Sequence, residues 1–187
     1  MRKVVAWLFI SLDGVVEAPH LWQEGLMDDD MLADITSQIE AEDAILMGRV
    51  TYQEFASFWP TATDEPFASH INKTPKYVVS TTLDKAEWGR WDQPKLIKDT
   101  KRLAKEIGAL KQQAGKDIGV SGSPTLVRSL LREGLLDELK LMIHPVIVGS
   151  GKRLFKEDGA LQKLQLVDSK VTSKGVAILT YQPDKKR

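Results

Sequence analysis

Two short glycine-containing segments carry the residue types that hold phosphate groups. In the first, an apolar run is followed by Gly48, Arg49, Val50 and Thr51. In the second, another apolar run is followed by Ser121, Gly122, Ser123, Pro124 and Thr125. A helix that starts after a glycine turn presents unpaired N–H groups and its positive dipole end to an anion. Both segments are therefore candidate phosphate sites, with Arg49 adding a charged fork and Ser123-Pro124 a typical helix start.

A purely structural interpretation of both segments stays open. A glycine after a strand and a Ser-Pro pair at a helix start are ordinary features of strand–helix turns. Neither segment is a GxGxxG or Walker fingerprint, and short motifs have high false-positive rates.

Metal and nucleophile chemistry have little support in the sequence. His20, His70 and His144 are far apart and show neither HxxxH nor HExxH spacing, so we expect no metal site. His144 precedes Pro145 and is expected to be a packed or capping residue. Cysteine is absent, which excludes disulfide scaffolds, thiolate metal sites and a cysteine nucleophile. No GxSxG elbow is present.

Composition sets limits on the partners of the chain. Its 187 residues include 26 Lys and Arg against 26 Asp and Glu, so the formal net charge is zero. Because neutralising a polyanion requires a surplus of basic residues, we expect no nucleic-acid partner. The apolar run at 4–10 is too short for a signal peptide or a membrane span. We therefore expect a cytoplasmic protein with no membrane partner.

Apolar periodicity predicts the elements that position the two segments. Short apolar runs predict strands at 3–10, 44–47, 76–80, 95–97, 117–121, 138–148, 163–171 and 175–182. Stripes of helical spacing predict helices at about 28–39, 49–59, 64–72, 99–114 and 123–132. Asp28, Asp29 and Asp30 suit the first turn of a helix.

This order of elements predicts the fold class. Strand–helix units come first and antiparallel strands last, which is typical of an α/β layer fold with a mixed sheet. Residues 1–187 are expected to form a single domain, since no linker or repeat is visible. In a parallel sheet, ligands bind outside the carboxyl ends of the strands, where both glycine segments would lie. Two such anion sites facing one crevice would suit a pyrophosphate.

Six ordered motifs carry a resemblance over nearly the whole chain. They are SLDG at 11–14, LMGRVTY at 46–52, FWP at 58–60, KYVVSTTL at 76–83, DIGVSGSPTLV at 117–127 and LLDELKLMIHPVIVGSGKRLF at 135–155. With them the sequence resembles the dihydrofolate-reductase-like superfamily. It is most similar to the reductase domain of the bifunctional riboflavin-biosynthesis deaminase/reductase and its stand-alone bacterial relatives.

The resemblance implies a three-layer fold, with helices on both sides of a central mixed sheet, and NADPH as the cofactor. It implies phosphate contacts from Gly48, Arg49, Val50, Thr51, Ser121, Gly122, Ser123, Pro124 and Thr125. Ser80 and Thr81 match the strand end near the adenosine ribose and its 2′-phosphate. Leu12, Asp13 and Gly14 match a mobile loop that closes over nicotinamide in the family. Residues 145–151 resemble a segment near the substrate or at a dimer contact, and a homodimer is expected.

The sequence also departs from its relatives. The deaminase half is missing, with neither HxE nor CxxC. Dihydrofolate reductases carry one acidic residue facing the pterin, and the matching region here is Asp28 to Asp30 without a fixed register. The Gly-Gly pair of those enzymes is also lacking in the turn at Gly122. A pterin-like, pyrimidine-like or other heterocyclic carbonyl or imine is therefore expected in place of folate.

Three functions follow as hypotheses. The first is an NADPH-dependent reductase, an oxidoreductase of C=O, C=N or CH–NH bonds in a small heterocycle such as a 5-amino-6-(5-phosphoribosylamino)uracil. In it Asp13, or a carboxylate among Asp28 to Asp30, orients the substrate or water. The alternative is a non-catalytic NADP(H)-binding or regulatory homodimer that keeps the fold. A structural homodimer without nucleotide affinity is the third.

Overall fold

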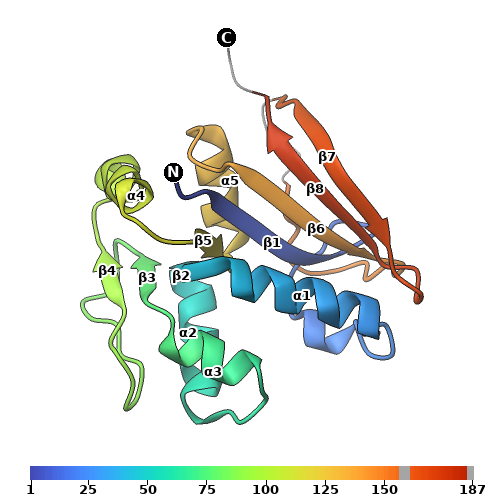
Figure 1. The fold of residues 1–187 in the computed structure, drawn as a ribbon, viewed down its shortest axis with the longest axis horizontal. Coiled ribbons are helices and arrows are strands. Elements are labelled where there is room, and N and C mark those ends of the chain that lie inside the picture. The colour runs from blue at the N-terminus through green and yellow to red at the C-terminus, as the bar shows by residue number, and fades with distance from the viewer. Residues whose placement is uncertain (156–160, 185–187) are drawn as a thin grey trace.

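A computed structural model describes residues 1–155 and 161–184 and contains one eight-stranded mixed sheet (Figure 1). The strands are β1 (Val4–Ser11), β2 (Glu42–Gly48), β3 (Lys76–Val79), β4 (Lys95–Ile97), β5 (Asp117–Val120), β6 (Glu138–His144), β7 (Leu164–Val171) and β8 (Ala177–Pro183). They lie in the order β4-β3-β2-β5-β1-β6-β8-β7. The first six in that order run parallel, while β8 is antiparallel to both β6 and β7. This confirms the α/β class and the antiparallel C-terminal hairpin.

Helices cover both faces of the sheet. They are α1 (Asp29–Ala41), α2 (Arg49–Phe58), α3 (Phe67–Lys73), α4 (Leu103–Gln112) and α5 (Pro124–Arg132). The helices α4 and α5 pack their apolar stripes against one face in a single large cluster. On the other face, α1 packs against β6 and β8, and α2 packs against β2 and β3. The predicted three layers are therefore present.

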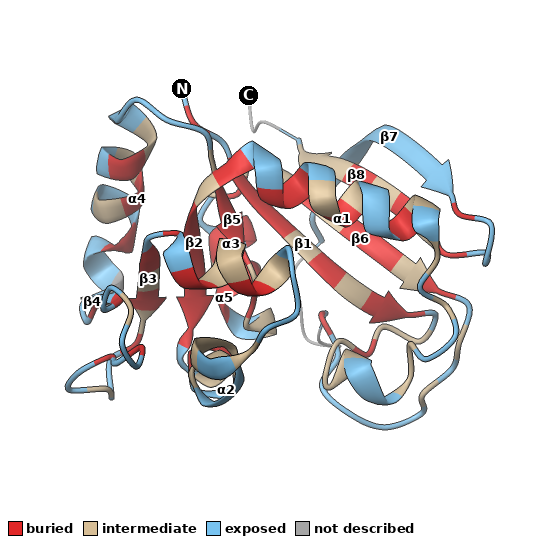
Figure 2. Ribbon diagram, turned by 60° about the horizontal axis from the view of Figure 1, so that its bottom comes forward, coloured by how far each residue is buried: buried red, intermediate tan, exposed pale blue. Residues whose placement is uncertain are grey.

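The residues of β1 show how the sequence divides between the two layers. Because side chains alternate along a strand, Ala6 and Leu8 enter the cluster with α4 and α5, while Trp7 and Phe9 pack in the cluster with α1. This strand lies between β5 and β6, so both of its faces and both of its edges are covered. Figure 2 shows the resulting burial of the central strands.

Three predicted boundaries are corrected. The strand predicted at 138–148 ends at His144, because Pro145 has no N–H to continue the ladder. The helix predicted at 64–72 begins at Phe67, since the residue before a proline is driven out of helical conformation and Pro66 follows Glu65. The helix predicted at 99–114 opens with the 3-10 turn Thr100–Arg102 and ends at Gln112.

The predicted helical start at Asp28 to Asp30 is confirmed. Asp28 is the N-cap of α1, and its carboxylate accepts the Met31 N–H at 2.9 Å. Asp29 and Asp30 lie in the first turn, where negative charge is favoured by the helix dipole.

Within residues 1–155 and 161–184, every helix is too short or too polar to cross a membrane.

Candidate functional site

The two glycine segments touch each other at the carboxyl edge of the sheet. Strands β2 and β5 are parallel neighbours, and the Gly48 N–H donates to the Gly122 carbonyl at 2.9 Å. A Cβ on Gly48 would lie 2.6 Å from Ser123 Oγ, and one on Gly122 would lie 2.8 Å from Thr51 Oγ1. Both distances are shorter than real Cβ contacts, so only glycine allows this approach. Gly122 also has a φ of +116°, which side-chain-bearing residues rarely adopt.

This contact brings the starts of α2 and α5 together. Gly48 is the N-cap of α2 and Ser123 that of α5, with Pro124 at the first helical position as predicted. Neither N-cap supplies a side-chain hydrogen bond to its helix. The first-turn N–H groups of both helices are therefore left uncapped by these residues, which is the arrangement that attracts an anion.

The contact lies at a switch in strand order. The chain leaves β2 toward β3 through α2 on one face, and leaves β5 toward β6 through α5 on the other. Where neighbouring strands send their helices to opposite faces, a crevice opens at the carboxyl ends. The two glycine segments lie at that position, at the carboxyl ends of β2 and β5.

The remaining side chains of the two segments differ in exposure. Arg49 is exposed, and its guanidinium donates to Gln53 Oε1 at 3.0 Å within α2. Thr51 is buried against Gly122. Val50 is half-buried, while Thr125 is exposed and accepts a hydrogen bond from Arg128 at 3.1 Å. Arg49 is thus held at the start of α2 with its charge in solvent.

Ser80 and Thr81 follow β3, one strand beyond β2. Ser80 is buried, and its hydroxyl accepts the N–H groups of Thr82 and Leu83 at 3.2 and 3.1 Å. Thr81 is exposed beside it. The Ser80 hydroxyl therefore holds the turn after β3, and Thr81 presents its own hydroxyl to solvent.

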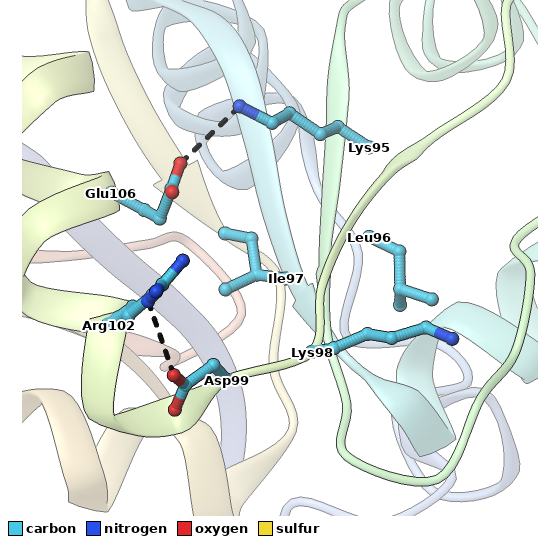
Figure 3. A pocket seen from close by; sticks show the side chains of 7 residues that line it. All are labelled: Lys95, Leu96, Ile97, Lys98, Asp99, Arg102 and Glu106. Carbon is cyan, nitrogen blue, oxygen red and sulfur yellow. Dashed lines mark hydrogen bonds and ion pairs between the residues drawn. The ribbon is translucent and has the colours of Figure 1, made fainter.

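A pocket of about 200 Å³ lies beyond this turn, between β4 and α4 (Figure 3). The Ser80 N–H donates to the carbonyl of Ile97, which lines the pocket. Figure 3 shows Lys95 and Glu106 reaching toward each other, 3.4 Å apart, with Arg102 and Asp99 paired at the same distance. The pocket thus carries mixed charge in place of the purely positive surface that would mark an anion site.

The Leu12–Gly14 segment is tied to a partner far along the chain. The Leu12 N–H donates to the Val146 carbonyl at 2.9 Å, and the Leu154 N–H donates to the Gly14 carbonyl at 2.9 Å. Gly14 has a φ of +84°, and the Leu12 side chain is 62% exposed. In this structure the segment is therefore held against residues 146–154.

The Asp13 carboxylate is the centre of that attachment. It accepts the Ser11 hydroxyl at 2.6 Å and the N–H groups of Val148 and Gly149 at 3.0 and 2.9 Å. Arg153 lies 3.3 Å from Oδ2 and also donates from Nε to the Asp13 carbonyl at 2.8 Å. The Ser11 hydroxyl and the Val148 N–H hold the pKa of Asp13 well below its usual range. The side chain is therefore an ionised anchor at neutral pH.

Asp28 and Asp30 are also engaged, on a different element. Asp28 accepts the Lys174 N–H at 2.8 Å, and Asp30 accepts the hydroxyl and N–H of Ser173 at 2.7 and 3.1 Å. Both carboxylates fasten the start of α1 to the turn between β7 and β8.

One long-range contact escaped sequence reasoning. Arg153 contacts Asp13 although the two residues are 140 positions apart, and no local sequence pattern predicts such a pair.

His144 is fully buried as expected for a packed residue, and its ring contacts Phe9 and Trp22 edge-on. Its Nδ1 donates to the Met142 carbonyl at 2.8 Å, whereas Nε2 has no hydrogen-bond partner within the described ranges. Burial lowers the pKa of His144, so the ring is neutral.

Comparison with known proteins agrees with this architecture. The uncharacterized protein YyaP of Bacillus subtilis (strain 168) is 31% identical over 186 residues, covering 96% of this chain and 94% of YyaP. A pyrimidine reductase-like protein from Corynebacterium diphtheriae NCTC superposes with a TM-score of 0.67 at 18% identity, covering 99% of this chain and 93% of that one. A dihydrofolate reductase from Enterococcus faecalis, complexed with NADP(H), gives a TM-score of 0.63 at 12% identity over 98% and 97% of the two chains.

The two structural likenesses show a shared fold, which confirms the predicted dihydrofolate-reductase-like class. The family assignment rests on the sequence itself, since residues 2–178 match the RibD C-terminal domain. The protein therefore belongs to the family of RibD C-terminal domains, as the ordered motifs predicted.

Proposed function

We propose that the chain, acting as one domain over residues 1–187, is an NADPH-dependent reductase of a small pterin-like or pyrimidine-like heterocycle. The observation that carries this is the contact between the starts of α2 and α5, closed by the Gly48 N–H to Gly122 carbonyl hydrogen bond. Two uncapped helix starts at one crevice suit the two phosphates of a dinucleotide. Membership of the RibD C-terminal domain family supports a reductase.

The residues fit NADPH at three places. The N–H groups that open α2 and α5, together with the Arg49 guanidinium and the Thr125 hydroxyl, would hold the pyrophosphate. Ser80 and Thr81, one strand away, would lie nearest the adenosine ribose and its 2′-phosphate. Gly122 fits because a side chain there would meet Thr51 and narrow the crevice. When bound, the cofactor would supply a hydride.

Asp13 has a positioning role in this proposal. A carboxylate that is ionised and bonded by Ser11, Val148 and Gly149 is poorly suited to donating a proton. It would instead fix the segment Leu12–Gly14, which is expected to lie beside the nicotinamide.

Arg49→Ala and Gly122→Asp test the cofactor site. Removing a charge-assisted hydrogen bond to phosphate costs about 1.5–3 kcal/mol, so Arg49→Ala should weaken NADPH binding roughly 10- to 150-fold. Gly122→Asp adds both a clash with Thr51 and a negative charge, so it should abolish binding. Isothermal titration of each purified variant with NADPH measures this.

Arg132→Ala is the matched control, since Arg132 is an exposed arginine at the opposite end of α5. Its affinity for NADPH should equal that of the parent protein. Unchanged affinity in both Arg49→Ala and Gly122→Asp contradicts the proposal.

A non-catalytic NADP(H)-binding or regulatory homodimer is the second candidate. It is favoured by the engagement of Asp13, Asp28 and Asp30, which are candidate substrate-orienting carboxylates whose oxygens already accept hydrogen bonds from the protein itself. A screen of oxidised pterins and ribosylaminouracils for NADPH oxidation, followed near ~340 nm as a property of the cofactor, separates the two. Binding of NADPH without turnover of any substrate favours this second candidate.

The pairing of two copies is proposed with either function, while the cytoplasmic location and the absence of nucleic-acid and membrane partners stay predictions. Light scattering of the purified chain at micromolar concentration should show a dimer.

A further inference from the structure

The two edges of the sheet differ in how they are protected. The edge strand β4 has three residues, begins with a lysine and lies beside α4, which is the usual way to blunt an edge. The opposite edge strand, β7, has eight residues, and seven of them are exposed. Figure 2 shows β7 exposed along its length, at the end of the sheet. A long open edge of this kind invites pairing with another strand.

The two faces of the terminal hairpin differ in their neighbours. Residues paired across β7 and β8 share a face, so Lys170 lies with Ile178, and Val171 with Ala177. Ile178 is buried in the cluster that contains α1, so that face is the covered one. Val171 is 68% exposed on the other face, and Leu166 is 48% exposed beside Tyr181 on that same face.

The sequence of the exposed strand is complementary to itself. Residues 167–171 read Val-Asp-Ser-Lys-Val, and all five are exposed. If two copies pair antiparallel about Ser169, Asp168 of each lies opposite Lys170 of the other, and Val167 lies opposite Val171. Directly opposite pairs of unlike charge and of β-branched side chains each favour pairing by about 0.2–1 kcal/mol.

We propose that this edge of β7 pairs antiparallel with the same edge of a second copy, with the two-fold axis at Ser169. The charges match only in this antiparallel arrangement, because a parallel pairing in the same register sets Asp168 against Asp168 and Lys170 against Lys170. The two sheets then join into one continuous sheet of sixteen strands. This inference rests on the pairing of copies proposed above and gives it a register.

Two existing features of the edge are compatible with the arrangement. Lys170 lies 3.5 Å from an Asp30 carboxylate oxygen, but both side chains are exposed, and such pairs contribute little. The ladder to β8 shifts register between Leu166 and Asp168, which places the irregularity at one end of the five-residue segment. The last four residues of the segment, Asp168 to Val171, are paired regularly with β8.

Charge reversal tests the register. Sedimentation equilibrium of the full chain should give twice the monomer mass for the parent protein. D168K and K170D each set like charges opposite one another twice, so each should sediment as a monomer. The double variant D168K/K170D restores both unlike pairs and should be a dimer again.

Mixing the two single variants tests the register most directly. An equimolar mixture of D168K and K170D places two lysines opposite two aspartates, so it should form a heterodimer although each variant alone is monomeric. Lys105→Asp, a reversal at an exposed site on α4 near the opposite edge of the sheet, is the matched control and should leave the dimer intact. Circular dichroism confirms that each single variant is folded.

Each outcome is decisive. A monomeric parent protein overturns both the pairing and its register. A parent dimer that persists in D168K and K170D keeps the pairing but overturns the β7 interface. Monomers in the single variants without recovery in the double variant or the mixture overturn the register about Ser169. NADPH affinity is measured on the same samples, so failure of the cofactor site is seen separately.

Discussion

At the scale of single residues, Asp13 is a candidate catalytic group whose carboxylate oxygens are already engaged in structural hydrogen bonds. Its two carboxylate oxygens meet one hydroxyl, two backbone N–H groups and a guanidinium. A carboxylate with this many donors is stabilised in its ionised form. Its contribution to stability is complete above the ordinary carboxyl pKa, near ~3.9, and is lost only as the pH falls through the lower folded value.

Asp13→Ala should therefore destabilise the protein by an amount that is constant between pH 5 and 8 and shrinks below about pH 4. Thermal unfolding of the parent and the variant over a pH series measures this difference. Amide exchange at Val148 and Gly149 should quicken roughly two- to tenfold in Asp13→Ala, as expected for one lost hydrogen bond. Asp13→Asn keeps one acceptor oxygen, so its stability should lie between that of the parent protein and that of Asp13→Ala. A stability difference that changes between pH 5 and 8 would assign Asp13 a titrating role instead.

At the scale of elements, the start of α1 carries two adjacent acidic side chains that differ in their contacts. Asp28 caps the helix and also binds the β7–β8 turn through Lys174, whereas the neighbouring Asp29 is exposed. Asp28→Ala should lower the free energy of unfolding by about 1 kcal/mol for the cap, and by more where the turn is released. Asp29→Ala should change it by less than about 0.5 kcal/mol. Urea unfolding compares the two, and equal losses would contradict the capping role.

Most of the strands and helices could be predicted from the sequence. All eight strands were expected, because each is a short apolar or alternating run, and Asp28 was expected at a helix start. Two of the three corrected boundaries lie at prolines, Pro66 and Pro145, whose effect on the neighbouring residue outweighs apolar content.

The site was readable only in part. The sequence predicted Gly48 and Gly122 at the carboxyl edge of one sheet, but their direct contact depends on β5 inserting beside β2, which is set by long-range packing. The anchoring of Asp13 by Arg153 depends in the same way on a loop far along the chain. Local patterns therefore identified the segments, and the sheet order decided what they touch.

At the scale of the whole molecule, balanced charge and a localised anion site make a joint prediction. NADPH at 100 times its dissociation constant should raise the free energy of unfolding by about 2.7 kcal/mol. For a chain of this size that corresponds to a rise in Tm of roughly 5–10 °C. Differential scanning fluorimetry measures the shift.

Two controls accompany that measurement. Gly122→Asp should show no NADPH-dependent rise in Tm, because the aspartate would clash with Thr51 and repel the phosphates. Duplex DNA should leave the Tm of the parent protein unchanged, because the chain has no net positive charge. If DNA raised the Tm as much as NADPH does, the rise would reflect general electrostatic attraction and not a specific cofactor site.

The position of β1 between β5 and β6 has a consequence for biosynthesis. Strand β1 ends at Ser11, but its neighbours in the sheet begin at Asp117 and Glu138. At about 5–20 residues per second, β1 waits roughly 5–21 s for the first of them. During that interval the apolar sequence Val4–Ile10 has no native partner strand, so we expect the nascent chain to expose an extended apolar segment of the kind that holding chaperones bind.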